Sequence, residues 1–250
     1  MKLKIGMIIC DNAPKWQPLL EPIVKRCFYR EGDEIRYFRA IDGDMPNLEN
    51  TADLDAMICL GSAKSAYENE PWMLQLCEFF KSVASTKLKL YGSCFGHQLI
   101  NRAFGGEVAK NAERGFVFGA DEIKINIPED LADTDLTKIL QNGSSLKVLN
   151  SHGDEVVSLG DGARLLGSSA RCKNEIVLVR DNILTMQCHP DLTPELMMMN
   201  IWPALTGKGA IDPADKEKIE EEMVDLDTDK CLDILRAFLE SPGSLGIQPK

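Results

Sequence analysis

Residues 88–98 read LKLYGSCFGHQ, and this segment decides the fold of the 250-residue chain. A short apolar run leads to Cys94, which stands between two glycines, and helix-forming residues follow. The pattern Gly-x-Cys-x-Gly predicts a nucleophile elbow, in which a strand turns sharply into a helix with the cysteine at the turn. Glycines at 92 and 96 leave space that Cβ atoms would fill, and the N-terminus of the helix favours a thiolate. The alternative is a structural cysteine at an ordinary strand-to-helix turn.

Strands and helices alternate on both sides of this segment. Near-continuous apolar runs are typical of strands covered on both faces, and amphipathic spacing between them indicates helices. We predict strands at 5–10, 34–38, 55–60 and 88–91, and helices at 16–29, 71–83 and 97–104. The alternation predicts an α/β fold, a three-layer, mostly parallel sheet with helices on both faces in a flavodoxin-like arrangement.

The second half of the chain changes character. A β-rich extension is predicted by short strand-like runs at 116–127, 147–149, 164–167, 175–180 and 183–188. Residues 192–205 read as one helix, and the charged stretch that follows reads as helical with a break near 225–228. We expect a single domain over 1–250, with a core at about 4–205 and a C-terminal helical segment at 214–240.

Composition argues against several classes of function. The net charge is −11 and no basic cluster is present, so neither nucleic acid nor a membrane is expected as a partner. The N-terminus has no signal-peptide pattern, and no apolar run is long enough to span a bilayer. The eight cysteines form no C-x-x-C pair, which predicts reduced thiols in a cytoplasmic protein and no metal site. Glycine-rich nucleotide-binding motifs are missing, so no cofactor is expected.

A second motif, His189-Pro190-Asp191, supplies a base for the cysteine. A nucleophilic thiol needs a base to take its proton, and the base needs an acceptor to orient it. His189 and Asp191 fit these two parts. Of the other two histidines, His97 lies on the helix after the elbow, where helical geometry carries its ring away from the thiol, and His152 is the competing base.

Three motifs in this order resemble those of the class I glutamine amidotransferases, the type with a Cys-His-Glu triad. They are GSCFGHQ at 92–98, NSHGD at 150–154 and HPD at 189–191, and the likeness runs from about residue 4 to residue 202. The resemblance implies that Cys94 is the nucleophile, that His189 is the base and that Asp191 orients it.

Attack on an amide carbonyl creates an oxyanion, which needs hydrogen-bond donors already in place. One donor should be the backbone N–H of Phe95, next to the nucleophile. A second should come from Gly61, where the family has its oxyanion loop. The resemblance also implies which residues contact a small-molecule γ-glutamyl substrate: Gln98, Ser151, His152 and Asp154.

The loop at residues 61–63 reads Gly-Ser-Ala where many family members have Gly-Gly-Pro. This difference favours the free-standing γ-glutamyl peptidase-like subgroup, which hydrolyses a γ-glutamyl amide through a γ-glutamyl thioester. The substrate would be glutamine or a γ-glutamyl peptide, such as a glutathione adduct.

Two alternatives remain open. One is a glutaminase subunit that delivers ammonia to a separate synthase subunit, because the roughly 45 residues after position 205 are too few for a synthase domain. The other is a non-catalytic binding protein of the same fold, because Asp191 is one methylene shorter than the family's usual Glu.

Overall fold

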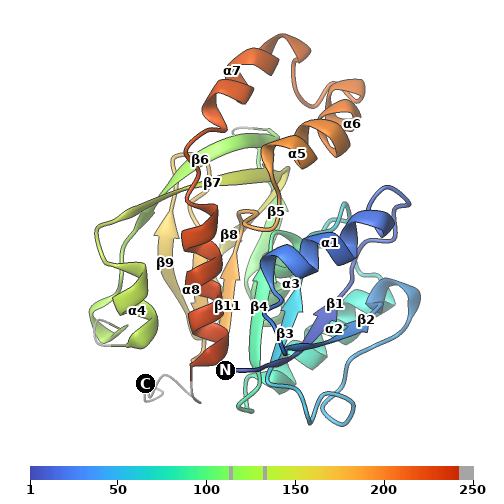
Figure 1. Ribbon diagram of the computed structural model, residues 1–250, viewed down its shortest axis with the longest axis vertical. Helices are drawn as coiled ribbons and strands as arrows, with labels where there is room; N and C mark the ends of the chain where they lie inside the picture. The colour runs from blue at the N-terminus through green and yellow to red at the C-terminus, as the bar shows by residue number, and fades with distance from the viewer. Residues whose placement is uncertain (113–114, 132–133, 242–250) are drawn as a thin grey trace.

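A computed structural model describes residues 1–112, 115–131 and 134–241. A nine-stranded sheet runs through the molecule in the order β2-β1-β3-β4-β11-β10-β9-β6-β7 (Figure 1). Its parallel half consists of β2 (Glu34–Phe38), β1 (Lys4–Ile8), β3 (Ala56–Cys59), β4 (Lys89–Ser93) and β11 (Ile183–Met186). Its antiparallel half consists of β10 (Ile176–Val179), β9 (Ala163–Ser168), β6 (Val117–Ile125) and β7 (Ser145–His152). A separate small sheet pairs β5 (Glu107–Lys110) with β8 (Asp154–Ser158).

Helices cover both faces of the large sheet and form the two outer layers (Figure 1). One face packs against α1 (Gln17–Cys27), α4 (Asp135–Leu140) and α8 (Thr228–Glu240). The opposite face packs against α2 (Pro71–Val83) and α3 (Phe95–Ala103). A third apolar cluster joins β6 and β7 to α5 (Pro194–Asn200), α6 (Trp202–Gly207) and α7 (Lys216–Glu222). Short 3-10 turns are η1 (Ala40–Asp42), η2 (Glu129–Leu131) and η3 (Pro213–Asp215).

The inner parallel strands β3 and β11 lie in the middle layer, covered by helices on both faces. β3 (AMIC) and β11 (ILTM) are buried at every residue, as expected for strands with helices on both sides. Because β1, β3, β4 and β11 are parallel, their carboxyl ends meet at one edge of the sheet, where ligands of such sheets bind.

The α/β fold, the three layers and the β-rich second half are confirmed. The stretch at 192–205 is helical over most of its length, but it forms two helices, since α5 ends at Asn200 and α6 begins at Trp202. Pro203 explains the break, because its ring removes a backbone N–H and clashes with the preceding turn of a helix. The strands β5 and β8 and the helix α4 were not predicted. Residues 242–250 of the expected domain lie outside the described residues.

The end of the described chain returns to its beginning. α8 buries Ile234 and Phe238 in the same cluster as the first strand, and Arg236 forms an ion pair with the buried Asp33 just before β2. Within the described ranges, every helix is too short or too polar to cross a bilayer.

Candidate active site

Cys94 lies at a strained turn between β4 and α3. Its backbone has φ 51° and ψ −105°, a region that residues other than glycine rarely adopt. The backbone N–H of Cys94 donates to Met186 O at 2.9 Å, and the N–H of Gln98 donates to Cys94 O at 3.0 Å. A Cβ on Gly92 would lie 2.6 Å from Ile100 Cδ1, and one on Gly96 would clash with the carbonyl of Cys59. Close packing under the thiol therefore requires both glycines.

His189 reaches the same edge of the sheet from β11. This strand pairs with β4 in parallel, with Met186 opposite Ser93. The residues that follow the two strands are therefore neighbours, although Cys94 and His189 are 95 residues apart in the sequence (189 − 94). The backbone N–H of His189 donates to Leu149 O at 2.8 Å, which fixes this segment against β7.

The shorter carboxylate of Asp191 does reach the imidazole. His189 Nδ1 lies 3.2 Å from Asp191 Oδ1, and both side chains are buried. The hydroxyl of Ser93 donates to the same Oδ1 at 3.4 Å and to Cys188 O at 3.2 Å. Since the carbonyl of Asp191 accepts from Arg26 Nη2 at 2.7 Å, α1 holds the backbone of the same residue. Ser93, which precedes Cys94, thus helps to hold the carboxylate that contacts His189.

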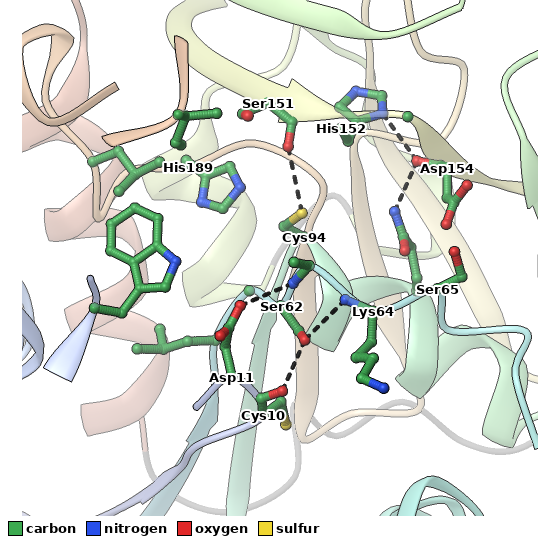
Figure 2. Close-up of a pocket in the computed structure, with 18 of the residues that line it drawn as sticks. Cys10, Asp11, Ser62, Lys64, Ser65, Cys94, Ser151, His152, Asp154 and His189 are labelled. Carbon is green, nitrogen blue, oxygen red and sulfur yellow. Dashed lines mark hydrogen bonds between the residues drawn. The ribbon is translucent and has the colours of Figure 1, made fainter. Parts of the chain in front are cut away.

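A cavity of about 550 Å³ opens over the elbow (Figure 2). In Figure 2 the side chains of Cys94 and His189 and the backbone carbonyl of Ser151 face one space, and Cys94 Sγ lies 3.9 Å from Ser151 O. The cavity is lined by eight of the nine residues singled out from the sequence: Gly61, Cys94, Gln98, Ser151, His152, Asp154, His189 and Asp191. The ninth, Phe95, packs its ring against Trp72 in the core at 5.8 Å between centroids, so only its backbone can face the cavity.

The charges at the site favour an ion pair. Burial lowers the pKa of His189, but the negative charges of Cys94 and Asp191 outweigh burial and raise this pKa well above its ordinary value. Burial raises the pKa of Asp191, yet the charge and hydrogen bond of His189 bring it below its ordinary value. The arrangement therefore favours a protonated imidazole on His189 beside an ionised Asp191.

The other two histidines are poor bases. Burial lowers the pKa of His152 to about 4 and that of His97 to about 3. His97 Nδ1 lies 2.8 Å from Thr185 Oγ1, and the His97 ring does not line the cavity. His152 does line it, with Nδ1–H donating to Asp154 O at 2.9 Å and Nε2 without a partner among the described residues. His152 is therefore a neutral ring whose Nε2 can accept a hydrogen bond.

The loop at Gly61 faces both reacting side chains. A Cβ on Gly61 would lie 3.0 Å from His189 Cε1 and 3.7 Å from Cys94 Cβ. In the described part of the chain, neither the Gly61 N–H nor the Phe95 N–H donates to a protein acceptor. Both donors remain available for a negatively charged oxygen.

Sequence reasoning missed the residue that holds this loop. Asp11 follows β1, and its carboxylate accepts from Ala63 N–H at 3.0 Å and from Ala13 N–H at 2.8 Å. The hydroxyl of Ser62 donates to Cys10 O at 2.8 Å, so the ends of β1 and β3 are joined (Figure 2). The signal was a polar residue at the carboxyl end of a parallel strand, which is where such sheets place their sites.

Gln98 makes its contacts away from the thiol. Its amide Nε2 donates to Asp154 O at 2.8 Å and to Gln187 Oε1 at 3.0 Å. These bonds connect α3 to β8 and to the segment that leads to His189.

Among the described residues, no three His, Cys, Asp or Glu side chains gather closely enough to hold a metal ion.

Comparisons with known proteins identify relatives of this chain. The family model described as glutamine amidotransferase class I matches residues 26–202. Gamma-glutamyl peptidase 2 of Arabidopsis thaliana is 31% identical over 211 residues, which cover 84% of this chain and 78% of the relative. Gamma-glutamyl peptidase 5 of the same plant is 29% identical over 219 residues, covering 85% of this chain and 84% of the relative. A glutamine amidotransferase structure from Thermotoga maritima superposes with a TM-score of 0.73 at 18% identity, covering 96% of this chain and all of that chain, which bears on the fold alone.

Proposed function

Because this chain belongs to the class I glutamine amidotransferase family, we propose that it hydrolyses a γ-glutamyl amide bond with Cys94 as the nucleophile. The names of the plant relatives favour a γ-glutamyl peptide as the substrate. The Gly-Ser-Ala sequence at 61–63 favours the same subgroup. Glutamine is the smallest amide that such a site could accept.

The acylation step uses the ion pair. The Cys94 thiolate attacks the γ-carbonyl carbon, and a C–S bond forms while the carbonyl oxygen becomes negative. The N–H groups of Phe95 and Gly61 donate to this oxygen. The C–N bond then breaks, and the proton on His189 passes to the leaving nitrogen, so that a γ-glutamyl thioester and a free amine result.

In the deacylation step, water takes the place of the leaving amine and His189 acts as a base. His189, now neutral and oriented by Asp191, takes a proton from a water molecule that attacks the thioester carbonyl. The C–S bond breaks, glutamate leaves, and the thiolate and imidazolium form again. No redox change or further reactant is needed.

The γ-glutamyl group is held at the polar end of the cavity. Ser151 and His152 lie at the end of β7 and Asp154 begins β8, close to Gln98. We assign the α-carboxylate to backbone groups around Ser151 and His152, and the α-amino group to Asp154.

One observation carries the proposal: Cys94 and His189 line the same cavity, and the second ring nitrogen of His189 is held by a carboxylate. A diazoketone analogue of glutamine should alkylate the purified protein once, and peptide mass spectrometry should locate the adduct at Cys94. Cys94→Ser should abolish both the adduct and hydrolysis of γ-glutamyl peptides. Cys27→Ser is the matched control, because Cys27 is the more exposed thiol, and it should still be labelled at Cys94.

Two results would replace the proposal. Absence of an adduct, together with no hydrolysis of glutamine or γ-glutamyl peptides, would leave the non-catalytic binding protein. Glutamine hydrolysis that appears only with a co-purified synthase would identify the ammonia-delivering subunit instead.

A further inference from the structure

The cavity over Cys94 has two chemically different ends. The polar end contains the residues assigned to the γ-glutamyl group. The opposite end, which we call the apolar wall, is formed by Trp16, Leu20, Ile23, Leu192 and Ile201. None of these five side chains carries a charge or a hydrogen-bonding group other than the indole N–H of Trp16.

The apolar wall stands on the side of His189. Leu192 follows the His-Pro-Asp segment by one residue, and Trp16, Leu192 and Ile201 belong to one apolar cluster. Figure 2 places His189 on one side of Cys94 and His152 and Asp154 on the other. The wall and the polar end therefore lie on opposite sides of the nucleophile.

Two hydrogen bonds fasten α1 to the segment that carries the base. Arg26 Nη2 donates to Asp191 O at 2.7 Å, near the end of the helix. Lys15 Nζ donates to Asn200 O at 2.7 Å, just before the helix begins, and lies 5.2 Å from the centre of the Trp16 ring. Since these contacts hold α1 at two points 11 residues apart (26 − 15), the wall is already in place without a ligand.

The chemistry of acyl transfer decides which part of the substrate meets this wall. The group that protonates the leaving nitrogen must lie within hydrogen-bond reach of it. His189 is that group under the proposed function, so the leaving amine lies on the His189 side of Cys94 while the γ-glutamyl group extends to the polar end. The substituent of the leaving amine then points at Trp16 and its neighbours.

We infer, on the basis of the proposed function, that the leaving amine carries an apolar or aromatic side chain and that Trp16, Leu20 and Ile23 of the α1 region select it. Such a side chain gains free energy by displacing water from the wall, whereas ammonia leaves the wall wet and a charged side chain loses its hydration there. The preferred substrates are γ-glutamyl amides of bulky apolar amino acids or amines, and glutamine is a poor substrate.

The test compares leaving groups that share one acyl group. Initial rates should be measured with glutamine, γ-glutamylglycine, γ-glutamylphenylalanine and γ-glutamylglutamate. We expect kcat/KM for γ-glutamylphenylalanine to exceed that for γ-glutamylglycine by roughly 10- to 100-fold, the range that one apolar contact group provides. We expect γ-glutamylglutamate and glutamine to be no better than γ-glutamylglycine.

Two variants locate the preference in the wall. Trp16→Ala should reduce the phenylalanine-to-glycine ratio by roughly tenfold. Leu20→Lys should raise the ratio of kcat/KM for γ-glutamylglutamate to kcat/KM for γ-glutamylphenylalanine by roughly two- to fivefold, because it adds a cation where the acidic side chain would lie. Leu74→Ala, on the exposed side of α2, is the control and should leave both ratios unchanged. Ratios within one protein sample do not depend on how much of the sample is folded.

The outcomes separate this inference from the proposed function. Equal kcat/KM for the glycine and phenylalanine peptides, in a protein that is labelled at Cys94 and hydrolyses both, would overturn the inference and keep the hydrolase. The same holds if Trp16→Ala leaves the ratio unchanged. Absence of both labelling and hydrolysis would overturn the proposed function and this inference together.

Discussion

Replacing Asp191 with asparagine tests how the buried pair makes Cys94 reactive. His189 Nδ1 and Asp191 Oδ1 lie 3.2 Å apart. With an effective dielectric constant of about 20, opposite charges at this distance attract by about 5 kcal/mol, since 332/(20 × 3.2) is about 5. Removal of the carboxylate charge therefore lowers the pKa of His189.

Loss of the carboxylate charge destabilises the protonated form of His189, which attracts the negative charge of Cys94. Burial still lowers the pKa of His189 in the variant, while one of the two negative charges that raise this pKa is gone, so the protonated ring is less favoured. We expect kcat/KM of Asp191→Asn to fall roughly 10³- to 10⁴-fold, which is typical of losing the orienting carboxylate of a triad. Alkylation of Cys94 by iodoacetamide should also shift to higher pH. Both should be measured across roughly pH 5 to pH 10, by product analysis and by peptide mass spectrometry.

Asp191→Glu is the matched control, because it keeps the charge and changes only the length. It should keep the alkylation profile of the wild type, and its loss in kcat/KM should be smaller and come from fitting one more methylene into a buried site. If Asp191→Asn were alkylated at the same rate at every pH and hydrolysed γ-glutamyl peptides at the wild-type rate, the reasoning on the ion pair would be refuted.

Three further perturbations follow from the contacts around the site. Asp11→Ala should lower kcat by roughly 10- to 100-fold with KM little changed, because the Gly61 loop donates only in the transition state; Asp11→Asn keeps one acceptor oxygen and should fall between, and an unchanged kcat would contradict the role of the loop. Ser93→Ala removes the hydroxyl that donates to Asp191 and should lower kcat/KM by roughly 5- to 30-fold, with no change in thermal stability larger than about 1–2 kcal/mol; wild-type kinetics would show that His189 needs no such support. Burial raises the pKa of Glu175 to about 8, above its ordinary 4.5, so the folded protein binds the extra proton between these values and loses stability as the pH rises through them, by up to about 1.4 kcal/mol per pH unit. Glu175→Gln should therefore gain stability relative to the wild type from pH 5 to pH 8 in urea denaturation, and parallel pH curves for the two proteins would disprove the assignment.

The parallel half of the fold could be predicted because its sequence signal is continuous. The run at 5–10 is apolar along its length and the run at 55–60 is apolar after Asp55, since helices cover both faces of β1 and β3. The strands β5 and β8 gave little signal, because only Val108 and Val156 of these strands are buried and the rest face solvent at least in part. α4 has six residues, too few to show helical periodicity.

The residues of the site also differ in how far the sequence could predict them. Cys94 and His189 stand in motifs with local chemistry, so their positions in the sequence were enough to pick them out. Asp11 acts on Ala63 across 52 residues, and the wall around Trp16 forms only when α1 meets the segment after His189. Such contacts depend on tertiary packing, and no pattern within one segment encodes them.

A chain cut before residue 183 should carry only an ordinary thiol. The strand that brings the base is inserted between β4 and β10, and it follows the elbow strand by 90 residues (183 − 93). Closing such a long loop costs conformational entropy, and we expect one edge of β4 to stay unpaired until β11 has been made. During synthesis the early segments emerge first. Under the proposed function, acyl transfer therefore becomes possible only after residue 189 has been made, and copies of the chain that end earlier lack the base.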